Sequence, residues 1–213
     1  MEVYKNWTLP DGEQHYKYKL SRSGYYQKAE IEHALSFVKS FNVAHDIGAN
    51  VGFWAKKLAS RFKDVQAFEP VEEFFDCLRK NVKEPNVFLH CYGFSDKSEF
   101  KEIQWDVNAT GGASVVKSKY HRRLGAKNEC VKLITLDSLS ILELDFVKID
   151  CEGYEYFILK GGEQTIRRYQ PIINIEDKFD RYGLERGEAL RLLESWGARL
   201  LSRYQDDCVY GWD

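Results

Sequence analysis

The stretch AHDIGANVGFW, residues 44–54, decides the fold class of this chain of 213 residues. It begins within a predicted buried strand, Val43–Ile47, and runs into apolar residues at helical spacing: Ala55, Leu58, Ala59 and Phe62. Gly48 and Gly52 allow a tight turn between the strand and the helix. A strand, a glycine turn and a helix in this order indicate the first unit of a doubly wound α/β sheet, where ligands bind at the carboxyl ends of strands.

Asn50 and Phe53 distinguish this turn from a dinucleotide-binding loop. A GxGxxG fingerprint that starts at Gly48 needs glycine at both of those positions. Asp46, just before the turn, would also repel a phosphate group. The loop therefore favours a cationic nucleotide over NAD, and an NAD oxidoreductase is the least favoured interpretation.

Glu69 ends the next predicted strand, VQAFE, and lies 21 residues beyond Gly48. This spacing is close to the offset of about 20 residues at which an acidic side chain binds ribose hydroxyls. Carboxylates at Asp46 and Glu69 without a phosphate partner fit S-adenosylmethionine, whose product is S-adenosyl-L-homocysteine. The simpler alternative is that the glycines only turn the chain and that Glu69 caps the following helix.

The rest of the chain continues the alternation of strands and helices and closes with an antiparallel hairpin. The predicted strands cover residues 86–92, 145–150, 171–176, 198–204 and 207–212. We expect an α/β, Rossmann-like sheet with helices on both faces. The chain is predicted to be one domain over 1–213, with an N-terminal extension over 1–26 and an insertion over 98–145 between the third and fourth core strands.

Four segments resemble the FkbM family of S-adenosylmethionine-dependent methyltransferases, from about Ile31 to Glu176. They are DIGANVG, FEP, LDSL and VKIDCEGYEYFILKGG, of which KIDCEGYE is the most specific. The resemblance implies a class I methyltransferase sheet of seven mostly parallel strands with an antiparallel last strand. It also implies which residues line the cofactor, with Ser95 or Asp96 near the adenine edge: Asp46, Gly48, Asn50, Gly52, Glu69, Ser95 and Asp96.

Asp150 and Glu176 end the predicted fourth and fifth strands, and Glu152 lies two residues beyond Asp150. Methyl transfer to a hydroxyl requires alignment of the acceptor and acceptance of its proton. We predict this catalytic role for Asp150 first, Glu152 second and Glu176 third. Alternatively, Asp150 or Glu152 holds the methionine ammonium group, or Glu152 only caps the next helix. Asp150 and Glu176 can also bind a divalent cation, but the ligand set is incomplete, and we predict no metal.

The acceptor is expected to be a hydroxyl of a small molecule or a sugar or glycan. An Asn or Asp followed by Pro-Pro and an aromatic residue, a motif of amino-group methylation of bases, is absent from the fourth strand. The resemblance also implies O-methylation of sugars and secondary metabolites. The alternatives are an RNA methyltransferase that uses the basic loop Lys117–Lys127, and a non-catalytic module that only binds S-adenosylmethionine.

Two further segments are candidates for the wall of an acceptor pocket. The small residues of Asn108–Ser114 are predicted to form a mobile turn beside it. The early aromatic residues either cover the site or only fix the extension to the core: Trp7, Tyr16, Tyr25 and Tyr26.

Composition and charge bear on the expected partners and location of the protein. A net charge of −2 gives no general electrostatic reason to bind nucleic acid. No apolar run approaches the ~20 residues that span a bilayer, and the first residues lack the pattern of a signal peptide. Five cysteines without a CxxC pair indicate reduced thiols. We therefore predict a cytoplasmic protein without a membrane partner, and the sequence leaves its oligomeric state open.

Overall fold

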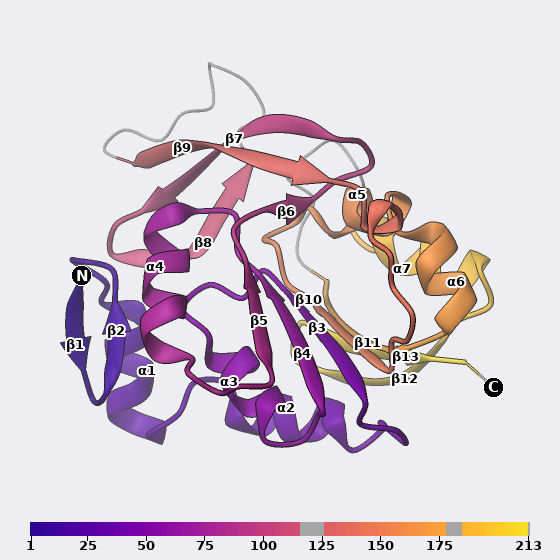
Figure 1. Ribbon diagram of the computed structural model, residues 1–213, viewed down its shortest axis with the longest axis horizontal. Coiled ribbons are helices and arrows are strands. Elements are labelled where there is room, and N and C mark those ends of the chain that lie inside the picture. The colour runs from indigo at the N-terminus through magenta and orange to yellow at the C-terminus, as the bar shows by residue number, and fades with distance from the viewer. Residues whose placement is uncertain (116–125, 178–184, 213) are drawn as a thin grey trace.

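The computed structural model describes residues 1–115, 126–177 and 185–212 and contains three sheets. The largest has the strand order β12-β13-β11-β10-β3-β4-β5 (Figure 1). Its strands are β3 (Val43–Ile47), β4 (Asp64–Phe68), β5 (Val87–His90), β10 (Phe146–Ile149), β11 (Ile172–Glu176), β12 (Arg199–Tyr204) and β13 (Asp207–Gly211). Strand β13 is antiparallel to both neighbours, and the other pairs are parallel. The predicted closing hairpin is therefore confirmed.

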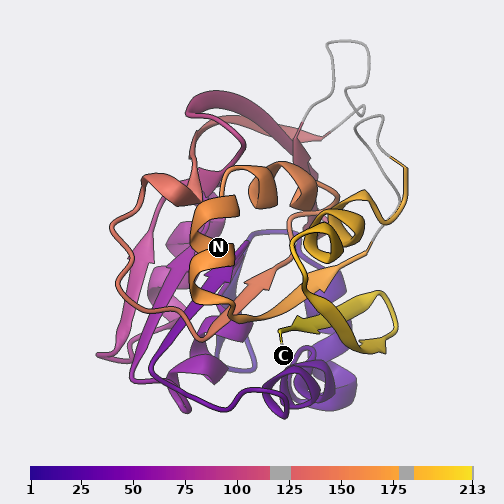
Figure 2. The same ribbon diagram turned by 90° about the vertical axis from the view of Figure 1, so that its right-hand side faces the viewer.

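Helices cover both faces of this sheet, as alternation along β10 shows. Phe146 packs with residues of α2 (Lys28–Leu35) and α3 (Phe53–Ala59), whereas Val147 and Ile149 pack on the opposite face. That second face carries α5 (Glu155–Lys160), α6 (Glu163–Tyr169) and α7 (Glu188–Ser195), which Figure 2 turns toward the viewer. The α/β class with helices on both faces is thus confirmed.

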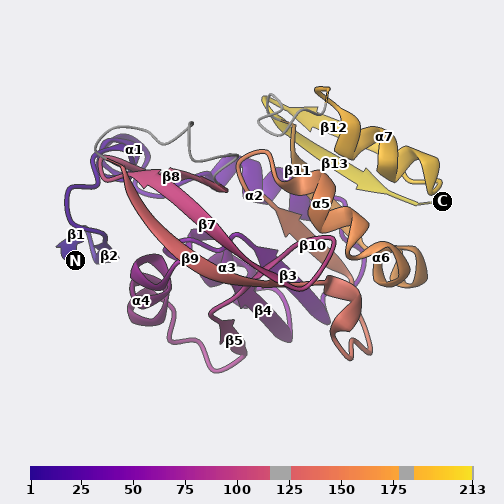
Figure 3. The same cartoon turned by 90° about the horizontal axis from the view of Figure 1, so that it is seen from above.

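The total number of strands exceeds the predicted seven, because two further sheets accompany the seven-stranded one. A four-stranded sheet has the order β6-β9-β7-β8 and is formed by β6 (Gly93–Phe94), β7 (Glu99–Asp106), β8 (Ala109–Val115) and β9 (Lys127–Ile134). Its buried residues Trp105, Val131 and Leu133 share a core with Ile47 and Ile149. Figure 3 shows β7 and β9 crossing over the larger sheet.

The N-terminal segment has more regular structure than its weak periodicity predicts. It forms the hairpin β1 (Glu2–Tyr4) and β2 (Trp7–Leu9), followed by α1 (His15–Ser23). The hairpin contacts α4 (Glu72–Asn81), and Asn81 exchanges two hydrogen bonds with the backbone of Thr8. These partners lie far away in sequence, so local periodicity carries no sign of them.

Two other predicted elements need correction. The apolar spacing of Tyr154–Arg168 predicts one helix, but Gly161 and Gly162 interrupt it and separate α5 from α6. A Cβ at Gly161 would lie 1.9 Å from the carbonyl oxygen of Ser95, so the close approach of that loop requires glycine. The expected turn over Asn108–Ser114 is mostly strand β8, paired with β7. Among the described helices, none has the length and apolar character needed to cross a membrane.

Candidate functional site

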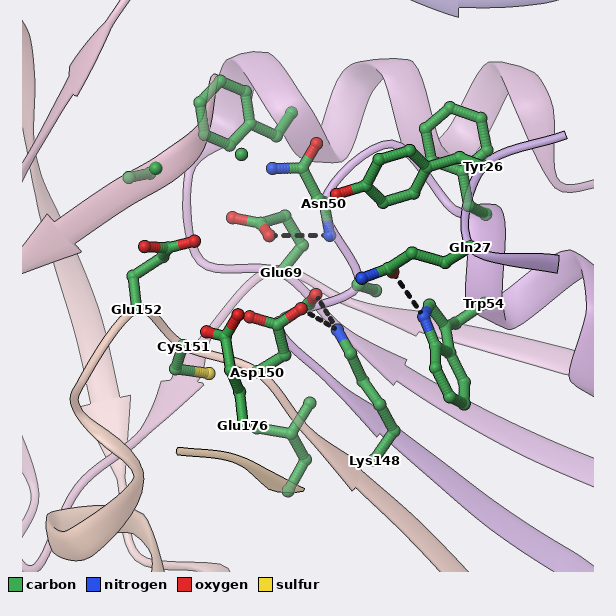
Figure 4. Close-up of a pocket in the computed structure, with 18 of the residues that line it drawn as sticks. Tyr26, Gln27, Asn50, Trp54, Glu69, Lys148, Asp150, Cys151, Glu152 and Glu176 are labelled. Atoms are coloured by element: carbon green, nitrogen blue, oxygen red, sulfur yellow. Dashed lines mark hydrogen bonds and ion pairs between the residues drawn. The ribbon is translucent and has the colours of Figure 1, made fainter. Parts of the chain in front are cut away.

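A cavity of about 980 Å³ opens where the carboxyl ends of β3, β4, β10 and β11 meet. The strand ends and the loops after them form one wall, which includes Gly48, Asn50, Glu69 and Asp150. The second wall comes from α1, the start of α2 and strand β8. Segments distant in sequence therefore enclose one site, and Figure 4 shows several of its lining residues.

Glu69 connects the loops that follow β3 and β4. Its carboxylate accepts the backbone N–H of Asn50 and that of Val71, both at 2.9 Å. Burial raises the pKa of Glu69 to about 7, although the two N–H donors act in the opposite direction. A carboxylate has about four acceptor positions, so ligand hydroxyls can still bind to this one. Glu69 is thus the side chain between these two loops that is best suited to accept hydrogen bonds from ribose hydroxyls.

Asn50 adopts the left-handed conformation, with φ 49°, within this loop. Its side-chain nitrogen donates to the carbonyl oxygen of Thr110 at 3.4 Å, across the cavity. Its Oδ1 atom is buried and has no hydrogen-bond partner among the described residues. A buried acceptor without a partner is costly, and a donor on a ligand would satisfy it.

Gly48 and Gly52 are required for close packing. Both have positive φ, and a Cβ at Gly48 would lie 2.2 Å from the carbonyl oxygen of Asp150. A Cβ at Gly52 would lie within 2.8 Å of side-chain atoms of Leu78 and Val82. Gly48 lines the cavity, whereas Gly52 faces α4 and is not among the described lining residues.

Lys148 lines the cavity and contacts two carboxylates and a backbone carbonyl oxygen. It was not identified from the sequence. It is 3% exposed, and its Nζ donates to the carbonyl oxygen of Gly48 at 2.7 Å. The same atom lies 3.5 Å from Asp46 and 3.7 Å from Asp150. Burial by itself would lower the pKa of Lys148, but the carboxylates of Asp150 and Asp46 raise it above its usual value. Lys148 is therefore a buried ammonium group.

Asp46 lies below the cavity surface. It is fully buried and is not among the described lining residues. Burial raises the pKa of Asp46, while Lys148 opposes that shift. Register explains the pairing, because Asp46 on β3 is directly opposite Lys148 on β10. Asp46 thus supports Lys148 from below the cavity and does not line it in the described residues.

Asp150, Glu152 and Glu176 are brought together as predicted. Each offers one carboxylate oxygen, and these atoms all lie within 4.8 Å of one another. Asp150 follows β10 and Glu176 ends the adjacent parallel strand β11, while Glu152 has a left-handed backbone conformation with φ 56°. Three acidic groups at this distance can accept a proton, hold an ammonium group or bind a cation.

Glu155, rather than Glu152, binds the backbone at the start of α5. Its side chain accepts the N–H groups of Cys151 and Gly153 at 2.8 and 3.2 Å. Burial raises the pKa of Glu155 to about 7. Glu155 thus holds the loop that precedes α5, and Glu152 lines the cavity (Figure 4).

Ser95 and Asp96 lie beside the cavity and are not among its described lining residues. The Ser95 hydroxyl is buried and lies 3.0 Å from the hydroxyl of Tyr154. The preceding residues of the same segment, Gly93 and Phe94, do line the cavity. Direct contact of Ser95 or Asp96 with an adenine ring therefore stays a prediction.

The second wall includes aromatic, amide and small side chains beside charged residues of α1 and α2. Tyr16, Tyr25 and Tyr26 line it and also pack around Phe53, so they both border the site and anchor the extension. Trp7 joins the same cluster, with its ring 4.3 Å from that of Phe53.

Glu13 fastens this wall to the insertion. Its buried carboxylate accepts the backbone N–H and hydroxyl of Thr110 at 2.7 and 2.5 Å, and the N–H of Tyr16 at 2.9 Å. Residues 108–114, predicted to border the pocket, do so as part of β8. Most of the basic loop 117–127 lies outside the described residues.

This sheet, with its site at the carboxyl ends of parallel strands, defines a class I methyltransferase-like α/β fold. A family model described as the methyltransferase FkbM domain matches residues 46–200. The chain therefore belongs to the FkbM methyltransferase family. A search of curated proteins found no match.

Solved structures support the fold. A methyltransferase FkbM from Methylobacillus flagellatus KT is 16% identical, with a TM-score of 0.54; the match covers 98% of this chain and 49% of that one. A precorrin-6y C5,15-methyltransferase from Geobacter metallireducens GS-15 is 14% identical, with a TM-score of 0.50 and coverage of 99% and 100%. A precorrin 8w decarboxylase from Methanobacterium thermoautotrophicum is 14% identical, with a TM-score of 0.54 and 99% coverage of both.

Proposed function

We propose that this protein is an S-adenosylmethionine-dependent methyltransferase that methylates a hydroxyl group of a small molecule or a glycan. The observation that carries the proposal is one cavity with two acidic positions. Glu69 lies beside the loop after β3, and the cluster of Asp150, Glu152 and Glu176 lies at the neighbouring strand ends. Membership in the FkbM family supports the same reaction class.

The residues of the first position fit the proposed cofactor. The Glu69 carboxylate would accept hydrogen bonds from the ribose, and the Oδ1 atom of Asn50 would gain the donor that it lacks among the described residues. The carbonyl oxygen of Gly48 would accept a hydrogen bond from the ammonium group. When bound, S-adenosylmethionine supplies a methyl group on a positively charged sulfur.

The acidic cluster would position the acceptor and take its proton. Asp150 adjoins the loop after β3, because a Cβ at Gly48 would lie 2.2 Å from its carbonyl oxygen. Glu152 and Glu176 complete the cluster from the loop after β10 and the end of β11. A carboxylate at hydrogen-bond distance from an acceptor hydroxyl orients that oxygen and accepts its proton during transfer. Cytosolic location and an oxygen acceptor remain part of this proposal.

We further propose that transfer needs no metal. Lys148 already provides a positive charge 3.7 Å from Asp150, which would repel a divalent cation from the cluster. Transfer should therefore continue in excess chelator. Loss of turnover with chelator, and its recovery on addition of Mg²⁺, would show that the three carboxylates bind a metal.

Calorimetry with S-adenosylmethionine and S-adenosyl-L-homocysteine tests the cofactor, and methyl transfer to a panel of hydroxyl acceptors tests the reaction. We expect binding of both nucleotides. Asp150→Asn should reduce turnover by about 10²–10⁴-fold and Glu152→Gln by less, because a positioned general base contributes about that factor. Absence of nucleotide binding would refute the proposal.

Two other outcomes would identify the alternative functions. Salt-dependent RNA binding that is lost when Arg122 and Arg123 are neutralised would indicate a nucleic-acid methyltransferase. Nucleotide binding without transfer to any acceptor, unchanged by Asp150→Asn, would indicate a binding module without catalysis.

A further inference from the structure

Gln27 immediately precedes α2 and lines the cavity opposite the acidic cluster. Its Oε1 atom accepts a hydrogen bond from the indole nitrogen of Trp54 at 2.8 Å. An indole N–H can only donate, so this contact fixes which end of the amide faces the tryptophan. The NH₂ group must therefore face the other way, and Figure 4 shows the Gln27 nitrogen pointing into the pocket.

Trp54 is a rigid support for this arrangement. Its ring is 3% exposed and stacks on Phe146, with an interplanar angle of 10° and a centroid distance of 6.3 Å. Gln27 itself adopts a left-handed backbone conformation with φ 51°, which is uncommon for a residue other than glycine. A fixed indole thus aims a neutral amide donor at the cavity.

The first turn of α2 adds positive potential at the same place. The first backbone hydrogen bond of the helix runs from Ile31 to the carbonyl oxygen of Gln27. The N–H groups of Lys28, Ala29 and Glu30 precede that bond, and these three residues line the cavity. Free N–H groups at a helix start favour an anion.

The cavity therefore has two poles. The carbonyl oxygen of Gly48 and the nearby acidic cluster form an acceptor-rich pole, while the Gln27 amide and the first backbone N–H groups of α2 form a donor-rich pole. An α-amino acid carries an ammonium group and a carboxylate on one carbon, and it matches such a pair of poles. The methionine part of the proposed cofactor has this chemistry.

We propose that the side-chain amide of Gln27 donates a hydrogen bond to the α-carboxylate of S-adenosylmethionine, with Trp54 as the residue that orients the amide. This assignment rests on the proposed function. Lys148 is a weaker candidate for the carboxylate, because its ammonium group already contacts Gly48, Asp46 and Asp150. Lys28 lines the same part of the cavity and is the competitor to test.

Calorimetry with two ligands isolates the carboxylate. S-adenosylmethionine is compared with its decarboxylated form, which retains the ammonium, sulfonium and nucleoside groups. Gln27→Leu should weaken binding of S-adenosylmethionine by about 10- to 100-fold, the range for a hydrogen bond to a charged group. It should change binding of the decarboxylated ligand little.

Gln27→Glu provides a second variant that preserves the contact to Trp54, because a carboxylate can also accept from the indole. It should repel the ligand carboxylate and reduce the preference for S-adenosylmethionine further. The ratio of the two dissociation constants is insensitive to a fraction of unfolded protein, since both ligands are measured on the same sample.

Three outcomes would overturn the assignment. Gln27→Leu could weaken both ligands equally, which would indicate a general structural role. Lys28→Met, instead of the Gln27 variants, could abolish the preference for the carboxylate. If the unmodified protein bound neither ligand, the proposed function would fail first, so the two failures are distinguishable.

Discussion

The two walls of the cavity differ in how they are built. The strand-end wall contains buried charges whose positions follow from sheet register, with Lys148 opposite Asp46 on adjacent strands. The second wall is assembled from α1, the start of α2 and β8, which are joined by contacts between distant segments, such as Glu13 with Thr110. The first wall carries the motifs shared with the FkbM family, whereas most of the second precedes residue 46, where the family match begins.

The difference bears on which wall can tolerate substitution. A buried charge on a central strand cannot move without leaving its partner unpaired. The first wall is therefore suited to binding a cofactor in one fixed position. Aromatic and small side chains on the second wall present a surface that substitution can reshape. The following predictions test how far the two walls differ.

The largest effect is expected at Lys148. Lys148→Met should destabilise the protein by about 3–5 kcal/mol, because it leaves Asp46 and Asp150 without their buried cation. Denaturant unfolding measures this free energy. Adding Asp46→Asn should recover part of it, since the neutral amide removes one uncompensated charge. A Lys148→Met protein as stable as the parent would show that the strand-end wall does not depend on this charge.

Gly48→Ala comes next, with a matched control at Gly24. Both glycines have positive φ, but a Cβ at Gly48 would lie 2.2 Å from the Asp150 carbonyl oxygen, whereas one at Gly24 meets no atom within 4 Å. Gly24→Ala should cost about 1 kcal/mol from backbone strain. Gly48→Ala should cost about 3 kcal/mol or more, because the β3 and β10 loops must separate. Equal losses in thermal unfolding would contradict the close packing.

Glu13→Gln tests the attachment of the second wall. The amide can replace only one of the two carboxylate oxygens that bind Thr110 and Tyr16, so we expect a loss of about 1–3 kcal/mol. Amide hydrogen exchange should become faster in α1 and β8 and remain unchanged in β3 and β10. Glu2→Gln, at a more exposed carboxylate of the same segment, is the control and should have little effect. Faster exchange throughout the larger sheet would show that destabilising the second wall also destabilises the first.

The smallest effect concerns the pH dependence of cofactor binding. The pKa of Glu69 is raised to about 7 by burial, so its carboxyl group is protonated below that pH and ionised above it. Ribose hydroxyls donate best to the ionised form. The affinity for S-adenosyl-L-homocysteine should therefore rise about tenfold from pH 6 to pH 8.

A pair of variants isolates this titration. Glu69→Gln should abolish the slope, whereas Glu155→Gln should retain it, although the pKa of Glu155 is also raised to about 7. Calorimetry at several pH values provides the measurement. If the pH dependence of the affinity disappears only in the Glu155 variant, the titrating group is Glu155 at the start of α5 and not Glu69.

Local sequence signals were sufficient where one segment contains the whole feature. The pattern DIGANVG predicted a strand, a turn and a helix because periodicity and glycine content act over a few residues. The acidic residues at 150, 152 and 176 were predicted to meet because parallel strands bring their carboxyl ends to one edge.

Features that need two distant segments were missed. Lys148 occurs within an apolar run, FVKI, and a charged residue in a central strand was the available signal. Its meaning depends on Asp46, about a hundred positions away. Glu155 was overlooked because the neighbouring Glu152 appeared equally able to bind the helix start. The second wall was only partly anticipated, since the irregular N-terminal residues gain their structure from β8 and α4.

The sequence alone determined the α/β class, the loop after β3 and the acidic residues at the strand ends, because each follows from short-range periodicity and residue chemistry. Only the tertiary structure decided that Lys148 neutralises two carboxylates, that Gly52 packs against α4, and that Gln27 faces the acidic cluster. The physical reason is that burial and partner choice arise when distant segments pack together, and no local pattern encodes that geometry.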